Sequence, residues 1–170
     1  SVVHGIVKKL NGNISVYSVE GEGTVFNILL PAIEKGEKEI DRSDSLIRGG
    51  TERVLLIDDE EAIINSIGII LENLGYSVTT FSEYGEALDA FARNPDAYDI
   101  VITDYSMPGM NGIEIARRIR EIRSDLPVIL NSGYVNMQLE EAAVSAGISA
   151  ILSKPVSTYR LADAIRKALF

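Results

Sequence analysis

Residues 54–60 read VLLIDDE, an apolar run that ends abruptly in acidic side chains. A continuous apolar run of this kind is typical of a strand that is buried on both faces of a parallel sheet. Residues 99–104, DIVITD, repeat the pattern further along the chain. Because parallel strands end at the same edge of a sheet, two such runs place their terminal aspartates near one another.

From Arg53 onward, short apolar runs alternate with amphipathic segments. The runs predict strands at Val54–Ile57, Ser77–Phe81, Ile100–Thr103, Val128–Asn131 and Ala150–Leu152. The segments between and after them predict helices near 60–74, 83–93, 112–122, 136–146 and 157–169. Five alternations of strand and helix predict an α/β fold with a five-stranded parallel sheet, doubly wound, with helices on both faces.

The first part of the chain has a different pattern. Residues 1–10 have apolar side chains at helical spacing, and the alternating runs Ile14–Ser18 and Thr24–Leu30 predict a β-hairpin that Pro31 closes. Residues 32–52 are rich in charge and end in two glycines, which is typical of a linker. We therefore predict three parts: 1–31, a charged linker at 32–52, and an α/β domain at 53–170.

Composition narrows the classes of function. Hydrophobic residues make up 46% of the chain, enough for a globular core. The net charge of −9 argues against a nucleic-acid surface or contact with an anionic membrane. No apolar run is long enough to cross a bilayer, and the chain has no cysteine, which suits a cytoplasmic location.

Ionisable and hydroxyl side chains stand at the predicted strand ends: Asp58, Asp59, Asp104, Ser132 and Lys154. Three carboxylates in one crevice repel one another unless a cation joins them. Mg²⁺ fits, because it pairs carboxylates with phosphate oxygens. A hydroxyl and an ammonium on the opposite side would bind the remaining phosphoryl oxygens, so the pattern indicates phosphoryl transfer.

Five strings resemble the receiver domains of bacterial response regulators, in order and at matching intervals. They are VLLIDDE at 54–60, DIVITD at 99–104, MPGMNG at 107–112, PVILNSGY at 127–134 and SKP at 153–155. The resemblance implies that Asp104 is the phosphoacceptor. It also implies metal ligation by Asp104, by Asp59 directly, by Asp58 through water and by the backbone carbonyl of Ser106. Ser132 and Lys154 would contact the phosphoryl group.

The resemblance implies two further features near Lys154. The Lys154–Pro155 peptide is expected to be cis, as is common in such receivers. The residue three positions before the lysine is often aromatic in the family, but here it is Ile151. This departure calls the paired rotation of Ser132 and an aromatic ring into question, and leaves a smaller loop movement as the expectation.

Residues 21–31, GEGTVFNILLP, resemble the end of the ATP-binding domain of sensor histidine kinases. The motifs that hold ATP in that family are missing from this chain, so we expect no kinase activity from it. The resemblance implies a piece of a hybrid sensor histidine kinase. Its partners would be a histidine-kinase phosphodonor domain and a histidine phosphotransfer protein.

Other interpretations remain open at this point. A Mg²⁺-dependent phosphatase with an aspartyl nucleophile would use the same acids, although its Asp-x-Asp pattern is absent from residues 58–60. A pseudo-receiver that only mediates contacts would need none of them. Residues 1–31, which expose an apolar face and an unpaired strand edge, are expected either to dock on a second copy, giving a homodimer, or to be partly disordered.

Overall fold

The computed structural model describes residues 2–10, 12–19, 23–31 and 49–170. The chain divides into two compact units, Ser1–Ser43 and Asp44–Phe170. In the first unit, helix α1 (Val2–Lys9) precedes the antiparallel strands β1 (Asn13–Val19) and β2 (Gly23–Leu29). The predicted helix and hairpin are therefore confirmed, whereas the predicted linker lies outside the described residues as far as residue 48.

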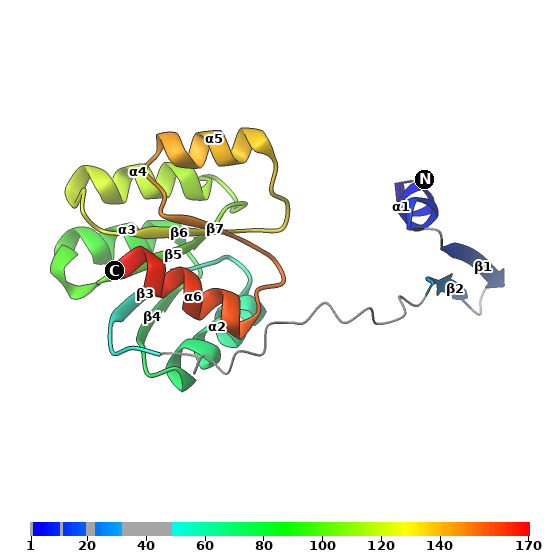
Figure 1. Ribbon diagram of the computed structural model, residues 1–170, viewed down its shortest axis with the longest axis horizontal. Coiled ribbons are helices and arrows are strands. Elements are labelled where there is room, and N and C mark those ends of the chain that lie inside the picture. The colour runs from blue at the N-terminus through cyan, green and yellow to red at the C-terminus, as the bar shows by residue number, and fades with distance from the viewer. Residues whose placement is uncertain (1, 11, 20–22, 32–48) are drawn as a thin grey trace. The chain divides into compact units, whose positions relative to one another are not determined.

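The second unit contains a five-stranded sheet in which every neighbouring pair is parallel (Figure 1). Its strands follow the spatial order β4-β3-β5-β6-β7. Their bounds are β3 (Arg53–Ile57), β4 (Ser77–Phe81), β5 (Ile100–Asp104), β6 (Val128–Ser132) and β7 (Ala150–Ser153). The predicted strands are confirmed to within one residue at each end.

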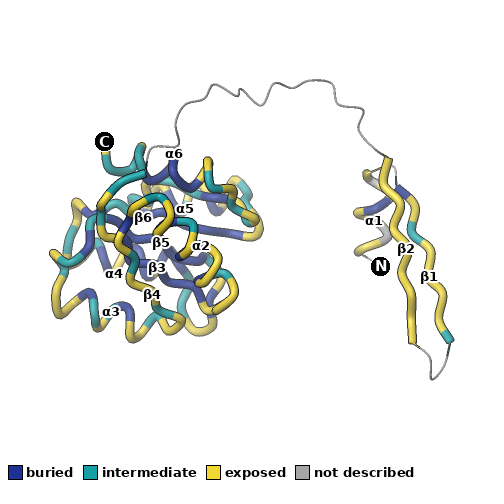
Figure 2. The backbone as a smooth tube through the Cα atoms, turned by 90° about the horizontal axis from the view of Figure 1, so that it is seen from below, coloured by how far each residue is buried: buried dark blue, intermediate teal, exposed yellow. Residues whose placement is uncertain are grey.

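Helices cover both faces of this sheet, as predicted. They are α2 (Glu61–Asn73), α3 (Tyr84–Arg93), α4 (Gly112–Ile122), α5 (Met137–Ser145) and α6 (Thr158–Leu169). Side chains of α2 and α6 pack on one face of the strands, and those of α3, α4 and α5 on the other. Figure 2 shows the central strands β3, β5 and β6 as the buried centre of this unit, whereas the edge strands β4 and β7 are partly exposed. A 3₁₀ turn, η1 (Pro95–Ala97), precedes β5 and was not predicted.

The polypeptide joins the sheet at the edge where the strands begin. The Gly50 N–H donates to the Leu74 carbonyl (3.1 Å), three residues before β3 starts. At the same edge, two guanidinium nitrogens of Arg53 donate to the Asp99 carboxylate at 2.7 and 2.9 Å. These bonds lower the pKa of Asp99 to about 2. The Arg53–Asp99 pair thus links the start of β3 to the segment that leads into β5.

We expect Asp99→Asn to lower the free energy of unfolding by about 1 kcal/mol at neutral pH, since both side chains are partly exposed and screened by water. A carboxyl whose pKa is lowered on folding stabilises the fold above its unfolded value, near 4, and loses that effect as the pH falls toward 2. Denaturant unfolding of the variant should therefore be less sensitive to pH between about 4 and 2. The exposed pair Lys167–Asp163 offers a control, because Asp163→Asn should change the free energy of unfolding by less than about 0.5 kcal/mol at neutral pH.

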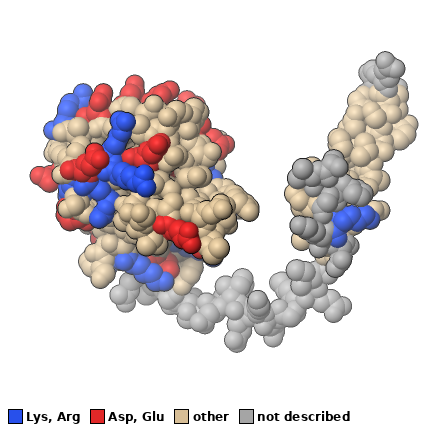
Figure 3. Space-filling model, turned by 90° about the horizontal axis from the view of Figure 1, so that it is seen from above, with Lys and Arg blue, Asp and Glu red and all other residues tan. Residues whose placement is uncertain are grey.

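Charged side chains of both signs are interspersed over the face of the second unit that Figure 3 shows. Among the residues that the structure describes, no helix combines the length and the apolar character needed to cross a bilayer.

Candidate functional site

Two buried aspartates lie at the edge where the strands end. Asp58 directly follows β3, and Asp104 is the last residue of β5. Only 1% of Asp58 and 5% of Asp104 is exposed. β3 lies between β4 and β5, so the strand order reverses beside it, which is where doubly wound sheets bind ligands. The topology therefore places both carboxylates at the expected ligand crevice.

Lys154, one residue after β7, connects these two acids. Its Nζ lies 2.7 Å from Asp104 Oδ1 and 2.9 Å from Asp58 Oδ2. The backbone N–H of Lys154 donates to the Ser132 carbonyl (2.8 Å), which ties the start of this loop to β6. The Lys154–Pro155 peptide is cis, as predicted. One ammonium thus contacts two carboxylates that come from different strand ends.

The pKa values of Asp58 and Lys154 are shifted. Burial raises the pKa of Asp58, and the hydrogen bond from Lys154 offsets that effect only in part. Burial works to lower the pKa of Lys154, but its hydrogen bonds to Asp104 and Asp58 outweigh this and raise it. The lysine therefore carries its charge at neutral pH, and this charge stabilises the ionised form of the buried Asp58.

The loop after β5 holds the other oxygen of Asp104. The Ser106 backbone N–H donates to Asp104 Oδ2 (2.7 Å), and the Gly112 N–H donates to the Tyr105 carbonyl (2.9 Å). Helix α4 then begins with a capping box in which Asn111 and Glu114 bond each other's backbone N–H. Both carboxylate oxygens of Asp104 are thus hydrogen-bonded, and the loop beside them is fixed at both ends.

Gly112 allows this loop to approach β5 closely. A Cβ atom at this position would lie 2.3 Å from the Asp104 carbonyl oxygen and 2.6 Å from Leu130 Cδ1. Because the first of these is a backbone atom at the site itself, it cannot move aside without displacing Asp104. We expect Gly112→Ala to lower the free energy of unfolding by about 2 kcal/mol, measured by denaturant titration.

Gly68→Ala provides a matched control for that change. Gly68 is also helical and buried, but a Cβ there would meet nothing within 4 Å. Alanine is the better helix former, so the control should be neutral or slightly stabilising. Equal losses in the two variants would contradict the close approach at Gly112.

Ser132 ends β6 but faces its own loop. Its hydroxyl donates to the Tyr134 carbonyl (2.8 Å) and accepts from the Tyr134 N–H (3.3 Å). Ser106 and Ser132 both line a cavity of about 500 Å³ beside the aspartates. The sequence located Ser132 at the correct strand end, but it did not predict this local pairing.

The third predicted acid has different surroundings. Asp59 is exposed and lines a small cavity of about 80 Å³, together with Ser82, Tyr84 and Met107. Among the residues described, no three acidic, histidine or cysteine side chains form a group that could hold a metal ion. The structure thus brings Asp58, Asp104 and Lys154 together and leaves Asp59 on the rim.

The donor atoms nevertheless suit a hard divalent cation. Two buried carboxylates and one ammonium leave a net charge of −1 in a site with little access to water. Carboxylate and carbonyl oxygens are the ligands that Mg²⁺ prefers. Asp58, Asp59, Asp104 and the Ser106 carbonyl could supply them, provided that the ion replaces part of the Lys154 contact with the acids.

Two residues near the site were not predicted. Glu60 Oε1 lies 3.7 Å from Lys154 Nζ, a long ion pair on an exposed side chain. Asn131 is paired in register with Asp104, is buried, and its Oδ1 has no hydrogen-bond partner. A polar amide in the apolar run VILNS of β6 was the available signal for Asn131.

Comparison with known proteins identifies the class. The family model for the response regulator receiver domain matches residues 54–166, about two thirds of the chain. The chain therefore belongs to the response-regulator receiver family. Its five-stranded fold agrees with a receiver domain from Clostridium thermocellum, with a TM-score of 0.66 and 36% identity over 69% of this chain and 94% of that one.

Two longer proteins resemble nearly the whole chain. Sensor kinase CckA of Brucella abortus (strain 2308) is 31% identical over 180 residues, which cover 99% of this chain and 19% of that protein. The aerobic respiration control sensor protein ArcB of Escherichia coli (strain K12) is 30% identical over 172 residues, covering 98% of this chain and 22% of its own length. The chain thus spans about a fifth of these relatives.

Proposed function

We propose that this chain is the phosphoacceptor part of a two-component phosphorelay and that Asp104 accepts the phosphoryl group from a phosphohistidine. The observation that carries the proposal is the pair of contacts on the buried Asp104 carboxylate, the Lys154 ammonium on one oxygen and the Ser106 N–H on the other. These contacts fix the direction of a nucleophile and place positive charge where the incoming phosphoryl oxygens would lie.

In the proposed step, a carboxylate oxygen of Asp104 forms a bond to phosphorus while the P–N bond of the phosphohistidine breaks. The electron pair of that bond stays on the imidazole nitrogen. Lys154 would remain paired with the new phosphoryl oxygens, and Ser132 would turn its hydroxyl toward them. Mg²⁺ bound to Asp58, Asp59, Asp104 and the Ser106 carbonyl would neutralise charge on the transferred group.

The parent is proposed to be a hybrid sensor histidine kinase. Similarity to the two sensor proteins extends over at least 98% of this chain, whereas the receiver domain from Clostridium thermocellum covers 69% of it. The extra similarity therefore includes residues before the receiver. We keep the division into a kinase-domain remnant at 1–31, a linker at 32–52 and a receiver at 53–170 as part of this proposal, with a cytoplasmic location for the receiver.

The partners follow from the same proposal. The phosphodonor would be a kinase histidine, and the phosphoryl group would pass on to a histidine phosphotransfer protein. The hairpin of the first unit exposes large apolar side chains, including Tyr17, Phe26 and Leu29, which favours a homodimer through residues 1–31. Light scattering that finds a monomer at every concentration would contradict the dimer.

The test of the phosphoacceptor is direct labelling. The chain is incubated with acetyl phosphate with and without Mg²⁺, and intact mass and peptide mapping locate the added group. We expect one phosphoryl group per chain, only with Mg²⁺, on Asp104, and labile to hydroxylamine as an acyl phosphate. A label on another residue would reject the assignment. Continuous hydrolysis of a phosphomonoester would instead favour the aspartyl phosphatase. The absence of any label would favour the pseudo-receiver.

A further inference from the structure

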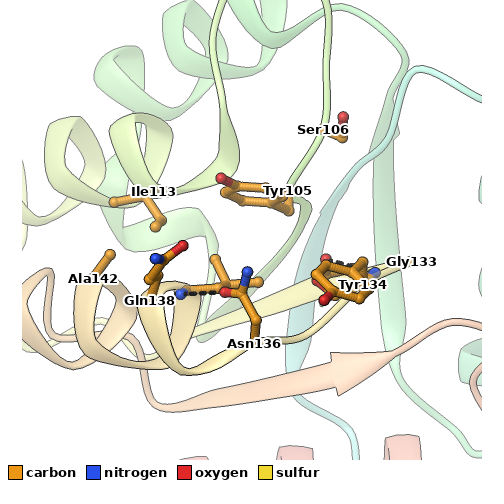
Figure 4. A pocket seen from close by; sticks show the side chains of 10 residues that line it. Tyr105, Ser106, Ile113, Gly133, Tyr134, Asn136, Gln138 and Ala142 are labelled. Atoms are coloured by element: carbon orange, nitrogen blue, oxygen red, sulfur yellow. Dashed lines mark hydrogen bonds between the residues drawn. The ribbon is translucent and has the colours of Figure 1, made fainter.

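A cavity of about 500 Å³ opens beside the site, between the first turns of α4 and α5. We call it the α4–α5 pocket. Ser106 and Ser132 line it next to the aspartates, and Ile113, Leu139 and Ala142 line it among the helices. Figure 4 shows Tyr105 and Ile113 on one side and Gln138 and Ala142 on the other. The pocket is therefore mainly apolar, with amide and hydroxyl groups at its margin.

Tyr134 also lines this pocket, although its own side chain is 74% exposed. It lies in the loop between β6 and α5, which ends where Asn136 Oδ1 accepts from the Leu139 N–H (2.8 Å). Between Ser132 and Tyr134 stands Gly133, around whose Cβ position there is open space. The loop thus has a fixed end at α5 and, near β6, a glycine that carries no Cβ to restrict backbone rotation.

Ser132 holds Tyr134 in its present place. The serine hydroxyl has a single proton, and it donates that proton to the Tyr134 carbonyl. Under the proposed function, the same hydroxyl would donate to a phosphoryl oxygen on Asp104. Ser132 cannot donate to both acceptors, so the phosphoryl group and the Tyr134 carbonyl compete for one hydrogen bond.

We infer that phosphorylation of Asp104 moves the Tyr134 ring into the α4–α5 pocket, an inference that rests on the proposed function. Once Ser132 turns away, the loop loses its bond to the Tyr134 carbonyl, and burial of the aromatic ring favours the new position. Gln138 at the margin is available to the phenol hydroxyl. Ile151 does not line this pocket and has no ring to place there. Two arrangements of one loop thus have different affinities for the phosphoryl group, as a switch requires.

The chain has neither tryptophan nor cysteine, so a single substitution gives a unique probe. In Tyr134→Trp, treatment with acetyl phosphate and Mg²⁺ should shift the emission to shorter wavelength and reduce acrylamide quenching about twofold, because the ring becomes buried. In Tyr134→Cys, the rate of reaction with a thiol reagent should fall under the same conditions. Because cysteine is much smaller than tryptophan, the second variant tests the same movement without the bulk of the indole ring. In each variant, intact mass measures the phosphorylated fraction.

Two controls separate pocket entry from other changes. Tyr159, 56% exposed on α6, gives Tyr159→Trp and Tyr159→Cys, whose signals should not respond to phosphorylation. Ala142→Leu fills the pocket from α5 and, combined with Tyr134→Trp, should remove the fluorescence change while Asp104 is still labelled. Full labelling with unchanged or increased exposure at position 134 would overturn the inference and leave the proposed function intact. Absence of labelling in the unmodified chain would instead reject the proposed function, and the inference with it.

Discussion

Asp104→Asn is expected to reduce phosphoryl incorporation below detection, because the amide nitrogen and oxygen that replace the carboxylate are poor nucleophiles. Acetyl phosphate with Mg²⁺ and intact mass spectrometry measure the effect. Asp58→Asn and Asp59→Asn should retain the nucleophile and lower the rate of labelling about tenfold or more through weaker metal binding. A graded series of this kind would distinguish the nucleophile from its ligands.

Stability provides the control for that experiment. In Asp104→Asn, Lys154 keeps its 2.9 Å contact with Asp58, and the repulsion between the two buried carboxylates disappears. The variant should therefore unfold at the same or a higher denaturant concentration than the unmodified chain. Asp99→Asn, at the opposite edge of the sheet, should be labelled normally. Labelling that persists in Asp104→Asn would rule out Asp104 as the acceptor.

Lys154→Met should have the second large effect, on both stability and chemistry. The change leaves Asp58 and Asp104 buried without the cation that contacts both of them, and we expect a loss of about 3 kcal/mol in the free energy of unfolding at pH 8. Labelling of Asp104 should slow about 100-fold, since a donor to the transferred group is lost. Denaturant unfolding without Mg²⁺ and the rate of labelling are the two measurements.

The loss of stability in Lys154→Met should depend on pH. Burial already raises the pKa of Asp58, and removal of the lysine raises it further. A carboxyl whose pKa is raised on folding costs no stability below its unfolded value, near 4, and an increasing amount as the pH rises above it. The deficit should therefore be smaller at pH 5 than at pH 8.

Two further variants test the cause of that loss. Asp58→Asn added to Lys154→Met should recover most of the lost stability, because one of the two unpaired charges is gone. Lys167→Met removes an exposed lysine paired with Asp163 at 2.8 Å and should change stability by less than about 0.5 kcal/mol. Additive effects in the double variant would show that Lys154 does not act through Asp58.

The fold could be predicted from the sequence because its strongest signals are local. The apolar composition of the runs that form β3 and β5 predicts that both strands are buried. The positions of Asp58 and Asp104 at one edge of the sheet then follow from its parallel topology alone. The short turn η1 gave no comparable signal. It is stabilised by a residue far away in the sequence, because Arg123 donates two hydrogen bonds to the carbonyls of Pro95 and Tyr98.

The geometry inside the site was less predictable. The strand order alone was enough to place Lys154 opposite the acids. Its contact with both of them, however, depends on how far its side chain extends from the end of β7 toward the ends of β5 and β3. That Asp59 is exposed while Asp58 is buried depends on which way the chain turns after β3. The pairing of Ser132 with Tyr134 is a loop conformation that no periodic pattern encodes.

The junction at Gly50 and Arg53 also determines how a donor can reach the acceptor. The polypeptide arrives at the start of β3, whereas Asp104 lies at the far end of the neighbouring strand, about 15 Å away along five residues of sheet. The point of attachment is thus separated from the acceptor by the length of one strand. Under the proposed hybrid-kinase origin, a phosphohistidine carried on the same polypeptide would reach Asp104 in an intramolecular step, and the rate of such a step would not fall on dilution.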